Sequence, residues 1–137
     1  RLERVGRRMA ARVEELPVTC RFRLLDSAER NAYSLSCGCI YVTRGLYDEL
    51  TTDELLAAIL AHEMGHVVAR DGKRPCSESS CQLGKETRAD AKALTYLSRC
   101  GYEPGALAAL IERVEADQPS GWAQHRLTAI RESLKTE

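Results

Sequence analysis

The sequence lacks any excess of charge. Twenty lysines and arginines balance twenty aspartates and glutamates, so the formal net charge is +0 with the histidines neutral. A chain without a basic excess has no electrostatic footprint for nucleic acid or for an anionic membrane surface. We therefore expect neither as a partner.

Long apolar runs and repeats are also missing. No stretch approaches the ~18 consecutive apolar residues that span a bilayer, and the chain starts at Arg1 without a methionine or a signal-like apolar segment. We expect a fragment or mature domain without a membrane span, whose anchor or leader would lie outside it. With 137 residues, we expect a single domain over residues 1–137 with one core. Nothing indicates the oligomeric state.

Cysteine, in contrast, is plentiful. An even number of cysteines in a small domain favours disulfides and an oxidising compartment. We expect a secreted, periplasmic or membrane-anchored protein that faces such a compartment, with the cytoplasm as the alternative. Two other states stay open: reduced thiols, or a four-thiolate zinc site whose C-x-C and C-x4-C spacings depart from the usual ligand pattern. The residues are Cys20, Cys37, Cys39, Cys76, Cys81 and Cys100. The four-thiolate site would use Cys37, Cys39, Cys76 and Cys81.

The N-terminal third combines a helical pattern with strand patterns. Apolar and basic residues alternate at helical spacing over residues 1–16, and Pro17 ends that segment because a residue before proline is pushed out of the α region. Residues 18–26 alternate with a period of two, which predicts a half-buried strand. Residues 32–46 are rich in β-branched and aromatic side chains around Gly38, which predicts a hairpin or a bent pair of strands.

The rest of the chain reads as helices. Thr51 or Thr52 can cap a helix that has an acidic first turn and runs to about Arg70, and its wide apolar face makes it the expected central helix. Further helices are expected over residues 82–100, 104–116 and 122–135. A few strands followed by many helices indicate an α+β domain that is mainly helical.

The central helix contains the sequence "HEMGH", with His62 and His66 four residues apart. Residues at this spacing share one helix face, so two imidazoles can bind the same cation, and zinc readily takes neutral imidazole. Glu63 lies off that line, where a general base can reach the attacking water. The alternative is a helix with two ordinary histidines. We favour the metal site because unpaired imidazoles on so apolar a helix would be costly.

The next helix offers a third ligand. Glu86 and Asp90 in "ETRAD" share a face; Glu86 can complete a His, His, Glu set, and Asp90 can accept the free N–H of a ligand histidine. Spacing alone leaves open that Glu86 is a surface charge paired with Arg88 or Lys85.

These motifs together resemble the gluzincin metallopeptidases of the HtpX, CAAX prenyl endopeptidase and Oma-type family. The resemblance rests on "NAYSLSCGCIYVTRGLYDELTTDELLAAILAHEMGH", "ETRAD" and "CGYEPGAL". It implies a zincin-like fold whose small β-sheet or hairpin borders the cleft, with one Zn²⁺ per chain. It also implies Glu86 as third ligand, Asp90 as its supporting acid and Glu63 as base.

The same resemblance implies how substrate is held. His125 and Arg131 match a family His-x5-Arg element that approaches the active site, although Arg126 stands where the family has proline. As catalytic residues they would bind the substrate backbone or stabilise the tetrahedral oxyanion. The strand expected to pair with an extended peptide through its backbone consists of Cys39, Ile40, Tyr41, Val42 and Thr43.

A zinc-dependent endopeptidase that cuts peptides or unfolded proteins is therefore our leading hypothesis. Protein quality control is the role that the resemblance implies. One alternative is a zinc-binding or chaperone-like module without turnover. Another is a latent enzyme whose metal is capped by a thiolate from the loop at residues 76–81.

Overall fold

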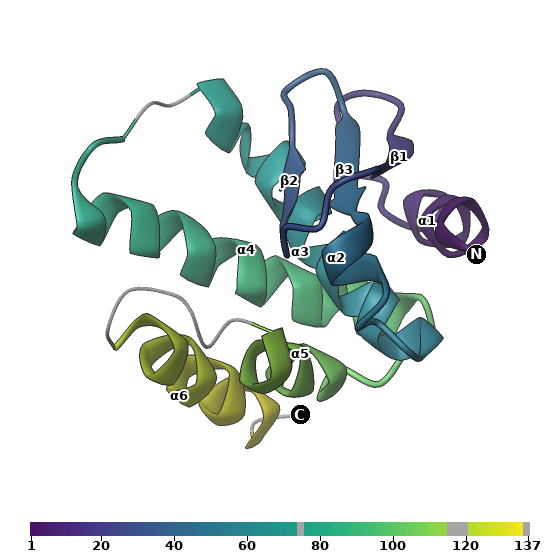
Figure 1. The fold of residues 1–137 in the computed structure, drawn as a ribbon. Coiled ribbons are helices and arrows are strands. Elements are labelled where there is room, and N and C mark those ends of the chain that lie inside the picture. The colour runs from purple at the N-terminus through teal and green to yellow at the C-terminus, as the bar shows by residue number, and fades with distance from the viewer. Residues whose placement is uncertain (74–75, 115–120, 136–137) are drawn as a thin grey trace.

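Helices form most of the structure, beside one small sheet (Figure 1). The computed structural model describes residues 1–73, 76–114 and 121–135. The mainly helical α+β class is confirmed. In chain order the elements are α1 (Leu2–Ala10), β1 (Arg21–Leu25), β2 (Ala32–Ser34), β3 (Cys39–Thr43), α2 (Arg44–Tyr47), α3 (Asp53–Ala69), the 3-10 turn η1 (Asp71–Lys73), α4 (Ser79–Arg99), α5 (Ala106–Val114) and α6 (Trp122–Lys135).

The sheet has the strand order β1-β3-β2. β1 runs parallel to β3, and β2 runs antiparallel to it, with Tyr33 opposite Tyr41. The predicted hairpin around Gly38 is thus present as β2 and β3. Because β3 is the middle strand, both of its edges are already paired, and the open edges of the sheet belong to β1 and β2.

Helix α3 is the central helix, as predicted. The Thr52 hydroxyl accepts a hydrogen bond from the Leu55 N–H at 3.2 Å, and Arg70 ends the helix in the left-handed conformation at φ 58°. α3 packs against α1, α4 and α5 and against the sheet, and residues on every side of it are buried. None of the described helices combines the length and apolarity needed to cross a membrane.

Two local predictions were wrong. The first helix ends at Ala10 rather than at residue 16, because the N–H groups of Arg12 and Val13 bond to carbonyls three residues back and tighten the chain into turns that bury Val13. The segment after β3 forms the short helix α2 instead of extending the strand. The Thr43 hydroxyl caps it by accepting the Leu46 N–H at 3.3 Å.

One disulfide joins two of the six cysteines. Cys76 and Cys81 are bonded, with their Cα atoms 6.0 Å apart, whereas Cys20, Cys37, Cys39 and Cys100 are free. The four-thiolate zinc site is therefore wrong, because two of its ligands bind each other. For the same reason, neither Cys76 nor Cys81 offers a free thiolate to cap a metal.

Thiol counting tests this arrangement. In denaturant without reductant, a thiol reagent should modify four cysteines per chain, and it should modify all six after reduction. The reason is geometric, since a Cα separation of 6.0 Å lies within the range that a disulfide spans. Peptide mapping of the unreduced protein should join residues 76 and 81. Six reactive thiols before reduction would contradict the structure.

Candidate active site

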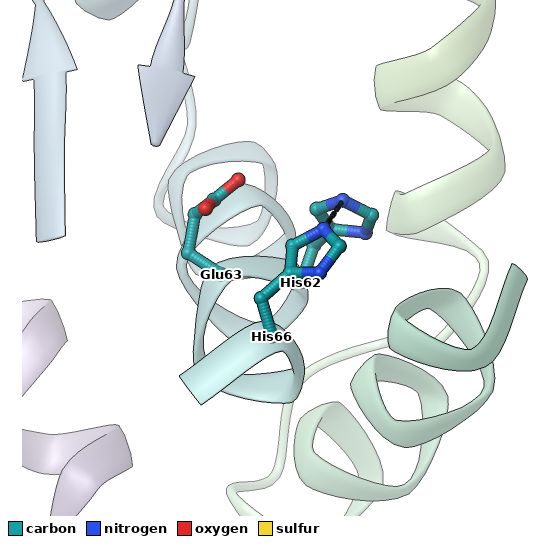
Figure 2. A group of neighbouring side chains, drawn as sticks. All are labelled: His62, Glu63 and His66. Carbon is teal, nitrogen blue, oxygen red and sulfur yellow. Dashed lines mark hydrogen bonds between the residues drawn. The ribbon is translucent and has the colours of Figure 1, made fainter. Parts of the chain in front are cut away.

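Two histidines and a glutamate gather on the buried length of α3 (Figure 2). His62 is 3% exposed and Glu63 is 5% exposed. One ligand atom of each of His62, Glu63 and His66 lies within 4.8 Å of the others. The Nε2 atoms of the two imidazoles are 3.1 Å apart. The spacing of four residues thus places the Nε2 atoms of the two rings next to each other.

A carboxylate contacts the Nδ1 atom of each imidazole. Asp90 Oδ1 is 2.9 Å from His62 Nδ1, and Asp71 Oδ2 is 2.7 Å from His66 Nδ1. Asp90 comes from α4, as predicted, whereas Asp71 comes from the turn that follows α3. Each carboxylate can accept an Nδ1–H and so leave Nε2 as the free ligand atom, which is the usual arrangement around metal-binding histidines. Sequence reasoning missed the role of Asp71.

Glu86 faces both Nε2 atoms from α4. Its Oε2 is 3.0 Å from His62 Nε2 and its Oε1 is 3.0 Å from His66 Nε2. The helices come this close because of Gly65: a Cβ there would lie 2.9 Å from the carbonyl oxygen of Ala89 on α4. Any larger residue at position 65 would push the Glu86 carboxylate away from the histidines.

The charges of the cluster fit a bound cation. Burial alone would lower the pKa of His62 and His66, but hydrogen bonds with Glu86, and with Asp90 for His62, outweigh it and raise both pKa values. The pKa of Glu86 is lowered despite its burial, because both imidazoles bond to it. These groups thus favour a positive charge at the point where they meet. Two imidazole nitrogens and one carboxylate form a ligand set that suits zinc.

Glu63 is the other carboxylate that could serve as the third metal ligand in place of Glu86. Its ligand atom is near both histidines, but its side chain lies on the side of the strands and separate from the two imidazole rings (Figure 2). Burial raises its pKa, and the positive charges of His62 and His66 oppose this rise. Because Glu86 touches both Nε2 atoms directly, we assign the ligand role to Glu86 and leave Glu63 to act on protons.

Arg126 on α6 is a member of the site that sequence reasoning missed. Its guanidinium is 1% exposed and binds Asp90 through two bonds, Nε to Oδ2 at 2.7 Å and Nη2 to Oδ1 at 2.8 Å. Nη1 also lies 3.6 Å from Glu86 Oε2. The arginine therefore fixes the acid that orients His62 and balances part of the negative charge of the cluster.

The predictions for the rest of α6 need correction. The Arg131 guanidinium pairs with the exposed Glu112 of α5 instead of approaching the cluster. Arg131 follows Arg126 by five residues, which is roughly 140° around a helix, so the two side chains leave α6 on different sides. His125 is exposed, and its contribution stays a prediction.

A hollow of about 360 Å³ opens beside the cluster, bordered by β2 and α4 and by the only tryptophan, Trp122. The larger groove between α1 and β1 contains no residue of the cluster. The hollow is lined by Ala32, Tyr33, Ser34, Glu63, His66, Asp71, Gly72, Gln82, Lys85, Glu86 and Trp122.

The strand that borders this hollow is β2, which corrects the prediction that the backbone of residues 39–43 binds substrate. β3 is hydrogen-bonded on both sides and has no free edge. The N–H groups of Thr43 and Leu35 bond to the carbonyls of Asn31 and Cys39. In an antiparallel pair such bonded positions alternate, so the backbone groups of Ala32 and Ser34 point away from β3 to the open edge.

Comparison with known proteins agrees with this geometry. The family model for peptidase family M48 matches residues 1–83, which include His62, Glu63 and His66 and end before Glu86. No curated protein matches the chain. The match covers more than half of the sequence, and the chain therefore belongs to peptidase family M48, a family of metallopeptidases.

Proposed function

We propose that the protein is a zinc-dependent endopeptidase. The observation that carries this proposal is the meeting of His62 Nε2, His66 Nε2 and the Glu86 carboxylate within 3.1 Å of one another, with the buried Glu63 alongside. His62, His66 and Glu86 would hold the ion. When bound, zinc supplies Lewis acidity, which polarises the scissile carbonyl and lowers the pKa of water.

Glu63 is the proton carrier in this proposal. Its carboxylate lies beside the ligand atoms, pairs with none of the arginines in the described part of the chain, and has its charged form supported by a hydrogen bond from Ser34. It would take a proton from the attacking water and deliver the proton to the leaving amine. The raised pKa favours the first step, because a more basic carboxylate takes the proton from water more readily.

Substrate would lie along the open edge of β2. The outward N–H and C=O groups of Ala32 and Ser34 can pair with an extended peptide, which is β-strand addition. Further hollows adjoin the cluster at both ends of this edge: one of about 260 Å³ near Ala32 and one of about 160 Å³ near Ser34. An extended chain could continue past the cluster in both directions, which favours cleavage within a chain over removal of end residues.

The variant Ala32→Pro tests whether substrate pairs with the open edge of β2. Ala32→Pro removes an outward N–H without taking a hydrogen bond from the sheet, so we expect kcat/KM for peptides to fall about five- to tenfold, the loss of one hydrogen bond. Ala32→Val is the control for side-chain volume and should stay near the wild type. Kinetics with a fluorogenic peptide and a thermal melt of each variant measure this. Equal kcat/KM for the proline variant and the wild type would exclude pairing at Ala32.

Metal analysis combined with a cleavage assay tests the proposal as a whole. Purified protein should contain one zinc per chain, lose cleavage of an unfolded protein when a chelator removes the metal, and regain it on addition of zinc. Protein that holds zinc but cuts neither unfolded proteins nor peptides, under oxidising or reducing conditions, would instead favour the zinc-binding module without turnover.

A further inference from the structure

Exposed apolar side chains gather at one place on the surface. Among the described residues, the large hydrophobic side chains that are exposed are Val18 at 38%, Tyr33 at 39% and Leu35 at 46%. Tyr33 lies on β2 and lines the hollow beside the cluster. Val18 and Leu35 both line the next hollow along the same edge. Such grouping on an otherwise polar surface is typical of a binding site.

The hollow lined by Val18 and Leu35, called here the Val18 pocket, has a volume of about 160 Å³ and adjoins the catalytic cluster. It shares Ser34, His66 and Gly72 with the hollow at the cluster, so the two are adjacent. Its other lining residues are Pro17, Val18, Leu35, Ser36, Val67 and Arg70.

The walls of the Val18 pocket are fixed before any ligand arrives. The Leu35 N–H donates to the Cys39 carbonyl, and the Leu35 carbonyl accepts from the Gly38 N–H, both at 2.9 Å. Gly38 has φ +93°, and a Cβ there would lie 2.7 Å from Val18 Cγ2 and from the Thr19 carbonyl oxygen. The turn therefore packs tightly on the segment that carries Val18, and little ordering cost remains for binding.

We propose that the Val18 pocket is a specificity subsite that accepts an aliphatic side chain of the substrate. This rests on the proposed function, because it takes the peptide to lie along β2. A cavity of ~150 Å³ with apolar walls is large enough for benzene, so the pocket holds a side chain of the size of leucine or methionine. Pro17, Val18, Leu35 and Val67 form the apolar part of the wall and favour such a side chain through burial, beside the polar groups of Ser34, Ser36, His66 and Arg70. Arg70 at the pocket disfavours lysine and arginine.

Kinetics with a peptide series test the subsite. In fluorogenic peptides that carry leucine at successive positions of a glycine-rich sequence, leucine at one fixed position from the cleaved bond should raise kcat/KM about tenfold or more over glycine. Val18→Asp should reduce this leucine-to-glycine ratio at least about fivefold. Thr19→Asp is the matched control, because Thr19 is exposed and does not line the pocket. An unchanged ratio in Val18→Asp, or an equal loss in Thr19→Asp, would overturn the proposal.

A binding measurement separates this proposal from the proposed function. In NMR titrations of the Glu63→Gln variant, N-acetyl-leucinamide should shift the amide signals of Val18, Leu35 and Val67 more than N-acetyl-glycinamide does, and Val18→Asp should remove the difference. If these shifts were seen but the wild-type protein cut no peptide, the pocket would stand and the peptidase would be rejected. Equal responses to both probes would reject the pocket, whether or not the protein cuts peptides.

Discussion

Glu63→Gln is expected to lower kcat for peptide cleavage by roughly 10²- to 10⁴-fold, the usual contribution of a general acid or base, while the zinc content stays at one ion per chain. Glutamine has the same shape but cannot accept the proton from water. The fold should tolerate the change, because burial already raises the pKa of Glu63 and so disfavours its charge. Single-turnover kinetics together with metal analysis of the same sample measure both effects.

The matched control is Glu54→Gln, at the exposed start of the same helix. It makes the same chemical change on α3 and should leave kcat at the wild-type value. Loss of zinc from Glu63→Gln would mean that Glu63 is the third ligand, in agreement with its position within 4.8 Å of the histidines. Full activity of Glu63→Gln with bound zinc would reject the mechanism.

The parts of the site that follow from local spacing were predicted from the sequence. Thr52, an acidic first turn and an apolar face determine α3, and within a helix the positions of His62, Glu63 and His66 follow from the count of residues alone. The same holds for Glu86 and Asp90, which share one face of α4. Gly65 of α3 lies against Ala89 of α4, and this contact between the helices places both sets of residues at one site.

Strand order, in contrast, depends on contacts between distant segments. The pattern of residues 39–43 predicts a strand equally well in the middle or at the edge of a sheet. Only the parallel pairing of β1 with β3 makes β3 the middle strand, and this leaves β2 to face the hollow. The pairing of Cys76 with Cys81 was likewise one of many that the sequence allows.

Arg126 had a signal that sequence reasoning did not use. Ala123, Leu127, Ile130 and Leu134 form the apolar stripe of α6, and Arg126 lies beside it, four residues before Ile130. An arginine at the edge of such a stripe is either half-exposed or buried with an acidic partner. The sequence pattern predicts an acidic partner for Arg126 but does not identify Asp90, because 36 residues separate the two.

Removing either Asp90 or Arg126 alone should destabilise the fold strongly. Their side chains are 3% and 1% exposed, and a buried charge that loses its partner typically costs about 3–5 kcal/mol. We therefore expect the free energy of unfolding to fall by about this much in Arg126→Met and in Asp90→Leu, measured by urea denaturation. Arg131→Met, on the same helix in the exposed pair with Glu112, should cost less than about 1 kcal/mol.

The double variant Asp90→Leu with Arg126→Met separates stability from metal binding. Replacing both charges with apolar groups often restores stability, so its free energy of unfolding should exceed that of either single variant. Its zinc affinity, measured by chelator competition, should still be about 10- to 100-fold below the wild type, because His62 Nδ1 has lost the carboxylate that orients it. If zinc affinity recovered along with stability, Asp90 would serve only to neutralise Arg126, and the orientation of His62 would need another cause.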